Sequence, residues 1–198
     1  MILPIYNCFH PVLKKSTEPI TEINDELITL IDNMFDTLQR TDSGVGLAAN
    51  QVGVSKSIIV IDLKKDDDNP NFVPIALINP VIEFFSDDQN EYNEGCLSVP
   101  EIYEKVYRPK GIQLSYFDRN MKEHKIEDDD FLSRVIQHEI DHLHGILFFE
   151  RVSAIRRTLL KNKLRGIKKG DYEAEYDMIL PDGKKFRGIT KKKKKNRD

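Results

Sequence analysis

The sequence has few of the features that would place it in a membrane or outside the cell. Its 198 residues include only two cysteines, Cys8 and Cys96, which is too few for a disulfide framework and indicates reduced thiols. No apolar run is long enough to cross a bilayer. Residues 1–4 lack the basic start and apolar stretch of a signal peptide. We therefore expect a cytoplasmic protein without a membrane partner.

The chain also lacks internal repeats and a phosphate-binding loop. Residues 44–53, Gly-Val-Gly-Leu-Ala-Ala-Asn-Gln-Val-Gly, have neither the Walker spacing nor a following Lys-Ser/Thr pair. Their small side chains indicate that the backbone approaches something closely. Within this segment Gln51 could donate a neutral N–H to a substrate oxygen, or its amide could simply close a loop. The residues alone leave both interpretations open.

Charge is spread unevenly along a chain whose net charge is -3. Residues 151–198 hold 17 Lys and Arg against 6 Asp and Glu, a balance of +11, so residues 1–150 carry -14. A basic end on an acidic body suggests a nucleic-acid or ribosomal neighbour. The alternative is a solvated helix with a disordered tail, which we favour for Lys191 to Lys195. We expect one domain over residues 1–166 and a basic extension, partly strand or disordered, over 167–198.

One motif has a spacing that suits metal chemistry. His138 and His142 lie four residues apart and, on a helix, stand one turn above each other on the same face. Two imidazoles so placed can bind a divalent metal, and the intervening Glu139 can act as general base on a metal-bound water. The alternative is a half-buried helix in which one histidine is satisfied by hydrogen bonds and the other is solvated.

The residues around this motif favour a helix with distinct faces. One stripe combines the two histidines with two apolar residues: Phe131, Val135, His138 and His142. A neighbouring stripe should be core: Leu132, Ile136, Ile140, Leu143 and Leu147. The remaining face is polar: Ser133, Arg134, Gln137, Asp141 and His144. We expect Asp141 and His144 to be solvated or, at most, to support a metal ligand from behind, and the mixed stripe to place a metal at one end of an apolar pocket.

Two histidines are too few for a catalytic metal site, which usually has three protein ligands. Phe148 stands where one class of zinc protease has its third histidine, and no suitable downstream Glu follows. The third ligand should therefore come from upstream. In Glu-Gly-Cys-Leu-Ser-Val-Pro, residues 94–100, Cys96 could bind a metal as thiolate or could be a small buried hydrophobe.

Periodicity predicts the other elements. A helix is expected over 24–40 and another near 154–166, with an extended arm over 6–13. Strands are expected at 57–63, 75–82 with a bend at Pro80, 103–107, 111–118 and 123–127. Residues 87–93 read as a polar loop.

The three blocks 44–53, 94–100 and 137–142, in this order, resemble those of the peptide deformylases, and the resemblance runs from about residue 2 to residue 164. It implies an α+β fold with antiparallel sheets around a central metal-binding helix, in a single catalytic metallohydrolase domain. It makes Cys96 the third ligand beside His138 and His142. It also implies Fe²⁺ as the metal, with Zn²⁺, Ni²⁺ or Co²⁺ able to occupy such a site.

The resemblance further implies removal of the formyl group from N-formylmethionyl ends of nascent chains. A metal-bound water would attack the formyl carbon, with Glu139 carrying the proton to the leaving amine. The Gln51 side chain and the Leu97 backbone N–H would stabilise the oxyanion. The implied substrate pocket comprises Val45, Gly46, Phe131 and Val135. Two alternatives remain: another metal-dependent hydrolase on this fold, or a silent binding protein, against which the presence of Glu139 and Gln51 argues.

Some positions depart from the family's usual pattern. Asn50 replaces a more common Pro, Asp130-Phe131 replaces Gly-Leu, and Tyr103 stands where some members have a substrate-contacting Arg. These differences concern pocket shape rather than metal chemistry. Family members reach the ribosome through a basic C-terminal helix, so the expected contact here involves Arg156, Arg157 and Lys161.

Overall fold

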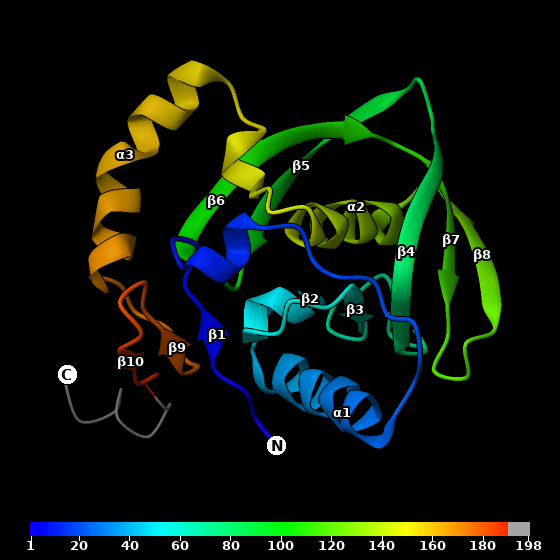
Figure 1. Cartoon of the computed structure of the whole chain (residues 1–198). Helices are drawn as coiled ribbons and strands as arrows, with labels where there is room; N and C mark the ends of the chain where they lie inside the picture. The colour runs from blue at the N-terminus through cyan, green and yellow to red at the C-terminus, as the bar shows by residue number, and fades with distance from the viewer. Residues whose placement is uncertain (190–198) are drawn as a thin grey trace.

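Three sheets surround one central helix, α2 (Phe131–Leu143), in the computed structural model, which describes residues 1–189 (Figure 1). A five-stranded antiparallel sheet has the order β2-β3-β4-β7-β8, β5 pairs with β6, and a small sheet has the order β1-β9-β10. The strands are β1 (Ile5–Tyr6), β2 (Gly46–Ala48), β3 (Ile58–Ile61), β4 (Ile75–Phe85), β5 (Gln89–Cys96), β6 (Val99–Pro109), β7 (Ile112–Phe117), β8 (Glu123–Asp128), β9 (Met178–Ile179) and β10 (Lys185–Phe186). The predicted α+β architecture around a central helix is confirmed.

The central helix begins and ends where the sequence provides capping groups. At its start the Asp128 carboxylate accepts the Ser133 N–H at 2.7 Å, which satisfies one unpaired donor of the first turn. After its end Gly145 has φ +74°, and a side chain there would lie 2.8 Å from the Lys14 carbonyl carbon. Ile136 and Ile140 face the five-stranded sheet within the second hydrophobic cluster. The metal-motif helix is thus fixed at both ends and along one side.

The second long helix, α1 (Asp25–Arg40), confirms the prediction over 24–40. The Asn24 side chain accepts the Leu27 N–H at 2.8 Å, and the apolar stripe through Ile31 and Met34 is fully buried against the rest of the core. The strand predicted at 57–63 is β3, buried along its length. β4 carries the bend predicted at Pro80 as a register irregularity between Ile78 and Val81.

The prediction of a polar loop at 87–93 is wrong, because Gln89–Cys96 forms β5 and pairs with β6. Most β5 side chains are polar and stay at least partly exposed, so polar composition did not prevent strand formation. β6 supplies the apolar face, with Ile102 and Val106 buried. The β5–β6 ribbon arches over the helix α2 on the side opposite β2 and β3 (Figure 1).

The first strand and the last strands of the described residues form the small sheet. The arm predicted over 6–13 is the strand β1 followed by the 3₁₀ helix η1 (Pro11–Lys14); the other 3₁₀ helices are η2 (Ala49–Val52) and η3 (Phe148–Glu150). β1 runs parallel to β9, with Ile5 opposite Met178 and both fully buried. The boundary at 166 stays a prediction. The lysine-rich run 191–195 lies outside the described residues.

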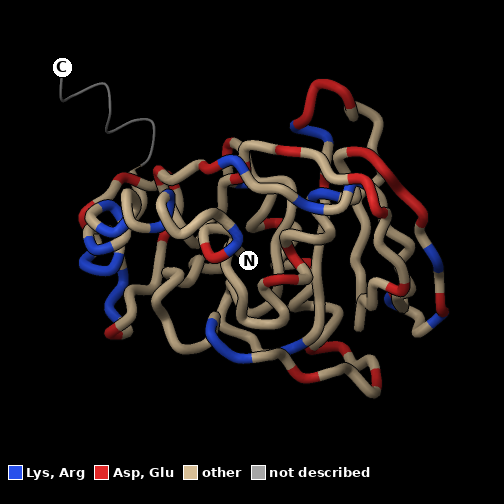
Figure 2. The backbone as a smooth tube through the Cα atoms, turned by 90° about the horizontal axis from the view of Figure 1, so that it is seen from above, with Lys and Arg blue, Asp and Glu red and all other residues tan. Residues whose placement is uncertain are grey.

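The last helix, α3 (Ala154–Lys169), starts as predicted at Ser153, whose side chain accepts the Arg156 N–H. It lies at one side of the molecule, with Leu160 and Ile167 as its buried residues. Lys and Arg gather along it, whereas basic and acidic segments are both spread over the rest of the backbone (Figure 2). Within residues 1–189 no helix combines the length and apolarity needed to cross a bilayer.

Candidate metal centre and substrate cavity

Cys96, His138 and His142 form a cluster that could hold a metal ion. The sulfur comes from the end of β5 and the two rings from successive turns of α2, whose centroids are 5.1 Å apart. Cys96 Sγ lies 3.1 Å from His142 Nε2, and one ligand atom from each residue falls within 4.8 Å of the others. A tetrahedral ion with bonds of about 2.0–2.3 Å needs ligand atoms separated by about 3.3–3.6 Å. The cluster therefore fits a single divalent cation.

The orientation of His138 is set by a carboxylate behind it. Glu94 Oε2 lies 2.9 Å from His138 Nδ1, which leaves Nε2 of that ring for the metal side. Arg108 donates to both oxygens of Glu94 at 2.7 and 2.9 Å. Burial alone would raise the pKa of Glu94, but these hydrogen bonds from Arg108 and His138 outweigh it and hold the pKa well below its usual range. The ring is thus held by a charged partner.

The same surroundings favour positive charge at the ligand cluster. Burial alone would lower the pKa of His138, but the neighbouring Cys96 and Glu94 outweigh burial and raise that pKa to about 10. Burial lowers the pKa of His142, so the second imidazole stays neutral. Cys96 and Glu94 therefore favour a positive charge at this place, and a bound cation would supply one. This is a second reason why these residues suit a metal.

Glu139 lies buried between α2 and β2. A side chain at Gly46 would place its Cβ 2.6 Å from Glu139 Oε1, so the glycine backbone lies directly against the carboxyl group. Glu139 Oε2 has no hydrogen-bond partner among the described residues, although the side chain is only 4% exposed. Burial raises the pKa of Glu139 to about 7. A carboxyl group with these properties can exchange a proton with a ligand near neutral pH.

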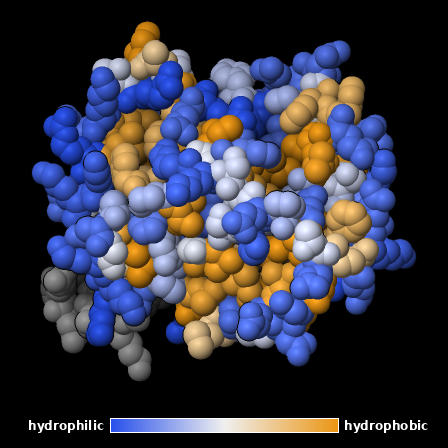
Figure 3. Space-filling model, in the orientation of Figure 1, coloured by the Kyte–Doolittle hydropathy of each residue, from blue (hydrophilic) through white to orange (hydrophobic). Residues whose placement is uncertain are grey.

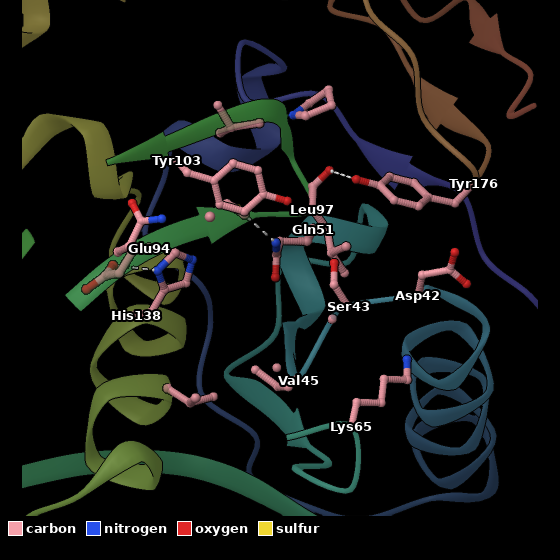
Figure 4. Close-up of a pocket in the computed structure, with 18 of the residues that line it drawn as sticks. Asp42, Ser43, Val45, Gln51, Lys65, Glu94, Leu97, Tyr103, His138 and Tyr176 are labelled. Carbon is pink, nitrogen blue, oxygen red and sulfur yellow. Dashed lines mark hydrogen bonds and ion pairs between the residues drawn. The ribbon is translucent and has the colours of Figure 1, made fainter. Parts of the chain in front are cut away.

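The Gln51 amide is oriented by the backbone of its own segment. Gln51 Oε1 accepts the Ala48 N–H at 2.8 Å, which turns the amide nitrogen toward the metal cluster. Gln51 Nε2 donates to Ser98 Oγ at 3.3 Å and lies 3.5 Å from Cys96 Sγ (Figure 4). The preceding Asn50 donates its side-chain N–H to the His142 carbonyl, which ties the 3₁₀ helix η2 to α2.

A cavity of about 780 Å³ joins these groups. Every predicted site residue except His142 lines it, and His142 instead contacts the Cys96 sulfur at 3.1 Å. Its apolar part includes Val45, Phe131 and Val135, with Tyr92 against Phe131 at a ring distance of 5.9 Å. An apolar pocket therefore opens beside the metal cluster, as the mixed helix stripe predicted.

Comparison with known proteins identifies the group to which this site belongs. Residues 2–158 match the family model described as polypeptide deformylase. The chain belongs to the peptide deformylase family. It is 42% identical over 191 residues to the peptide deformylase of Salinibacter ruber, covering 92% of this chain and 96% of that protein. It is 43% identical over 183 residues to that of Cytophaga hutchinsonii, covering 91% and 98%.

Solved deformylase structures share the fold. A peptide deformylase from Legionella pneumophila superposes with a TM-score of 0.75 at 36% identity, over 85% of this chain and 96% of that one. A plant peptide deformylase superposes with a TM-score of 0.79 at 33% identity, over 85% and 90%. The resemblance seen in the sequence is therefore confirmed in both sequence and fold.

Sequence reasoning placed the polar face of the deformylase motif helix wrongly. Asp141, expected to be solvated or at most to support a metal ligand from behind, is 5% exposed, accepts from Arg108 at 2.6 Å and pairs with Arg151. Arg134, on the same face, is also buried and donates to Glu94 at 2.8 Å. The β5–β6 ribbon covers this face, so its charges are paired inside the protein. Of Asp141 and His144, which were both expected to be solvated, only His144 is exposed.

The sequence of β6 contains a pattern that could have predicted the buried partner of Glu94 and Asp141, which is Arg108. Burial alternates along this strand, and Ile102 and Val106 mark the inward positions. Continuing that period of two puts Glu104 and Arg108 on the same inward side. A charged residue in an inward position must find a partner, and Arg108 finds Glu94 and Asp141. The predicted strand at 103–107 was too short to include Arg108, because β6 extends to Pro109.

Proposed function

We propose that Cys96, His138 and His142 hold the divalent cation with which this chain acts as a peptide deformylase. As a member of this family, the protein is a metal-dependent hydrolase that removes the N-formyl group from nascent polypeptides. One observation supports the residue assignment above the others: Cys96, His138, Glu139 and the Gln51 amide line a single cavity, and His142 Nε2 lies 3.1 Å from the Cys96 sulfur. Within it, Glu139 Oε2 has no hydrogen-bond partner among the described residues.

The chemistry follows from the roles these side chains can play. A cation in this cluster would act as a Lewis acid and lower the pKa of water toward neutrality. Glu139 accepts the proton of the attacking water and returns it to the departing amine, for which its pKa near 7 is suited. The Gln51 N–H and the Leu97 backbone N–H stabilise the negative charge that develops on the formyl oxygen.

The apolar end of the cavity would hold the first side chain of the substrate. Val45, Phe131 and Val135 provide apolar walls, and Gly46 presents its backbone where any side chain would collide with Glu139. An unbranched apolar side chain such as methionine fits a pocket of this kind because it buries apolar area without a polar group.

We propose ferrous iron as the metal used in the cell. One thiolate and two imidazoles form a donor set that suits Fe²⁺, and also Zn²⁺, Ni²⁺ or Co²⁺, so a purified sample could contain any of them. Cys96 is only partly buried, and an accessible thiolate is open to oxidation. Oxygen readily oxidises Fe²⁺ but not Ni²⁺, so the proposal predicts faster loss of activity in air for iron-loaded protein than for nickel-loaded protein.

We also propose that α3 contacts the ribosome in the cytoplasm. Arg157 and Lys161 are exposed, whereas Arg156 is already paired with Glu104 at 2.7 Å. Apolar atoms lie at the surface over the first turns of the helix (Figure 3), where Ile155 and Leu159 are exposed. If the contact is to RNA phosphates, affinity for ribosomes falls steeply between 50 and 200 mM salt, as is typical of such contacts. Affinity unchanged by salt would contradict this contact.

Anaerobic purification, metal analysis and assays on formyl-Met and acetyl-Met peptides test the function. We expect about one metal ion per chain and release of formate from the formyl peptide only. Glu139→Ala should retain the metal and lose turnover by about 10²–10⁴-fold. Glu123→Ala, an exposed glutamate on β8, is the matched control and should behave as wild type.

A second variant tests the ligand set separately. Cys96→Ala removes the thiolate, so metal content should fall together with activity. A fully metallated and active Cys96→Ala protein would remove this residue from the site. Equal turnover of acetyl and formyl peptides would instead favour a different metal-dependent hydrolase.

A further inference from the structure

The turn that joins β5 to β6 carries two of the groups assigned to the reaction. Cys96 pairs with Val99 in the ladder, so Leu97 and Ser98 form a two-residue turn between the strands. Among residues 1–189, the non-glycine residues with positive φ are Asn79, Glu101 and Met121, so both turn residues have negative φ. The favoured two-residue hairpin turns have positive φ at one or both positions, because only these match the twist of the strands.

The turn is tied to the rest of the protein from outside the hairpin. Two hydrogen bonds hold it, one to each carbonyl of the turn. The Cys8 N–H donates to the Ser98 carbonyl at 2.9 Å, and the Tyr176 hydroxyl donates to the Leu97 carbonyl at 2.8 Å. Figure 4 shows the Tyr176 ring pointing its hydroxyl at Leu97 beside the cavity.

The two donors belong to the opposite ends of the chain but to one structural unit. Cys8 follows β1 and Tyr176 precedes β9, and these strands pair with each other. The Ile5 N–H donates to the Asp177 carbonyl at 2.9 Å, one residue beyond Tyr176. Because Met178 is fully buried, the backbone that carries Tyr176 is anchored in the core. The tyrosine is thus presented to the turn from a fixed support.

Tyr176 also keeps its proton over the whole working range of pH. Burial raises the pKa of its hydroxyl far above the usual value, so the group remains a donor. It lines the same cavity as Gln51, Cys96 and Glu139. The residue lies beyond the segment 2–158 that matches the family model, so this contact is supplied by the chain's C-terminal part.

We propose that Tyr176 is a positioning residue for deformylation: by holding the Leu97 carbonyl, it fixes the orientation of the Leu97 N–H toward the formyl oxygen. The two groups lie on the peptide planes that meet at the Leu97 Cα. Cys96, at the start of the first plane, is held by its pairing with Val99, so a held Leu97 carbonyl leaves Leu97 anchored on both sides. The proposal rests on the role assigned to Leu97 in the proposed function.

The test compares two tyrosines of the same segment. Tyr176→Phe removes the hydroxyl and keeps the ring that lines the cavity. Tyr172→Phe is the matched control, because it removes a buried hydroxyl that makes no hydrogen bond to the turn. The assay is formate release from a formyl-Met peptide by the metal-loaded full-length protein, with metal content and thermal midpoint measured on each variant.

We expect Tyr176→Phe to lower kcat by about 3- to 10-fold, the effect of one hydrogen bond, while KM changes less than twofold. Metal content should match the wild type, because the ligands are untouched. Tyr172→Phe should keep the wild-type kcat, even if its thermal midpoint falls by as much as that of Tyr176→Phe. This split between kcat and KM is the signature of a group that acts only in the transition state.

The proposal would be overturned by an unchanged kcat in Tyr176→Phe, with or without a rise in KM, or by an equal loss of kcat in both variants. Loss of metal from Tyr176→Phe would also overturn it, because Tyr176 would then act on the ligands. Wild-type activity on formyl peptides tests the function independently, so failure of this proposal and failure of the proposed function give different results.

Discussion

The contact between Gly46 and Glu139 gives the sharpest prediction. A Cβ at residue 46 would lie 2.6 Å from Glu139 Oε1, 2.9 Å from Glu139 Cγ and 2.9 Å from Val135 Cγ1. Contacts below 3.0 Å do not occur at real Cβ atoms, so in Gly46→Ala the oxygen must retreat by about 0.4 to 0.8 Å. Glu139 and Val135, which would contact the new methyl group, are both buried, so neither side chain can turn toward solvent.

The size of the effect follows from that displacement. A misplacement of about 1 Å in a reacting group can cost about 10²-fold, so we expect Gly46→Ala to lose about 10- to 100-fold in kcat. The metal should remain, because the three atoms nearest to the new methyl group belong to Glu139 and Val135 and not to a ligand. Formate release under saturating substrate, with metal analysis on the same sample, measures both quantities.

A second glycine provides the control for this experiment. Gly166 lies in α3, where an added Cβ would meet nothing closer than 3.5 Å. Gly166→Ala should therefore keep full activity and gain slightly in stability, since alanine in a helix interior is more stabilising than glycine. A Gly46→Ala protein with wild-type kcat and full metal content would refute the assignment of Glu139 as the proton carrier in this position.

Three further substitutions test the groups around the metal cluster. Gln51→Ala should lower kcat by about 10²–10³-fold with little change in metal content, because one oxyanion donor is lost; wild-type kcat would contradict that role. Glu94→Gln should weaken metal affinity by about 10- to 100-fold in a competition titration against a chelator, since His138 loses its charged partner. Arg108→Met should cost about 1–3 kcal/mol in urea unfolding, because two buried carboxylates each lose one of their two guanidinium partners while Arg134 and Arg151 remain, and a cost below 1 kcal/mol would count against the buried network.

Local periodicity was enough to predict the helices but not every strand. α1 and α2 have apolar residues at helical spacing, and the capping residue Asn24 marks where α1 begins. β5 has no such pattern, because it is a strand through its pairing with β6 rather than through burial of its own side chains. A strand of this kind depends on a partner that follows it in the chain, so polar composition alone suggested a loop.

The site divides in the same way between local and distant information. His138, Glu139 and His142 could be predicted from spacing, because one helix carries all three. Cys96 and Gln51 come from segments more than 40 residues away from the motif, and only the resemblance to known deformylases connected them to it. Tyr176 could not be predicted, since its contribution depends on how β9 pairs with β1.

The errors on the motif helix have one physical cause. A helical wheel gives the direction of each side chain, but it does not say what covers each face. α2 is covered on its apolar side by the five-stranded sheet and on its polar side by β5 and β6, so even Asp141 and Arg134 are buried. Charges in such a place cost several kcal/mol unless they are paired. Placing a metal-binding helix in the interior therefore requires inward-facing charges such as Arg108, and these same charges orient His138 through Glu94.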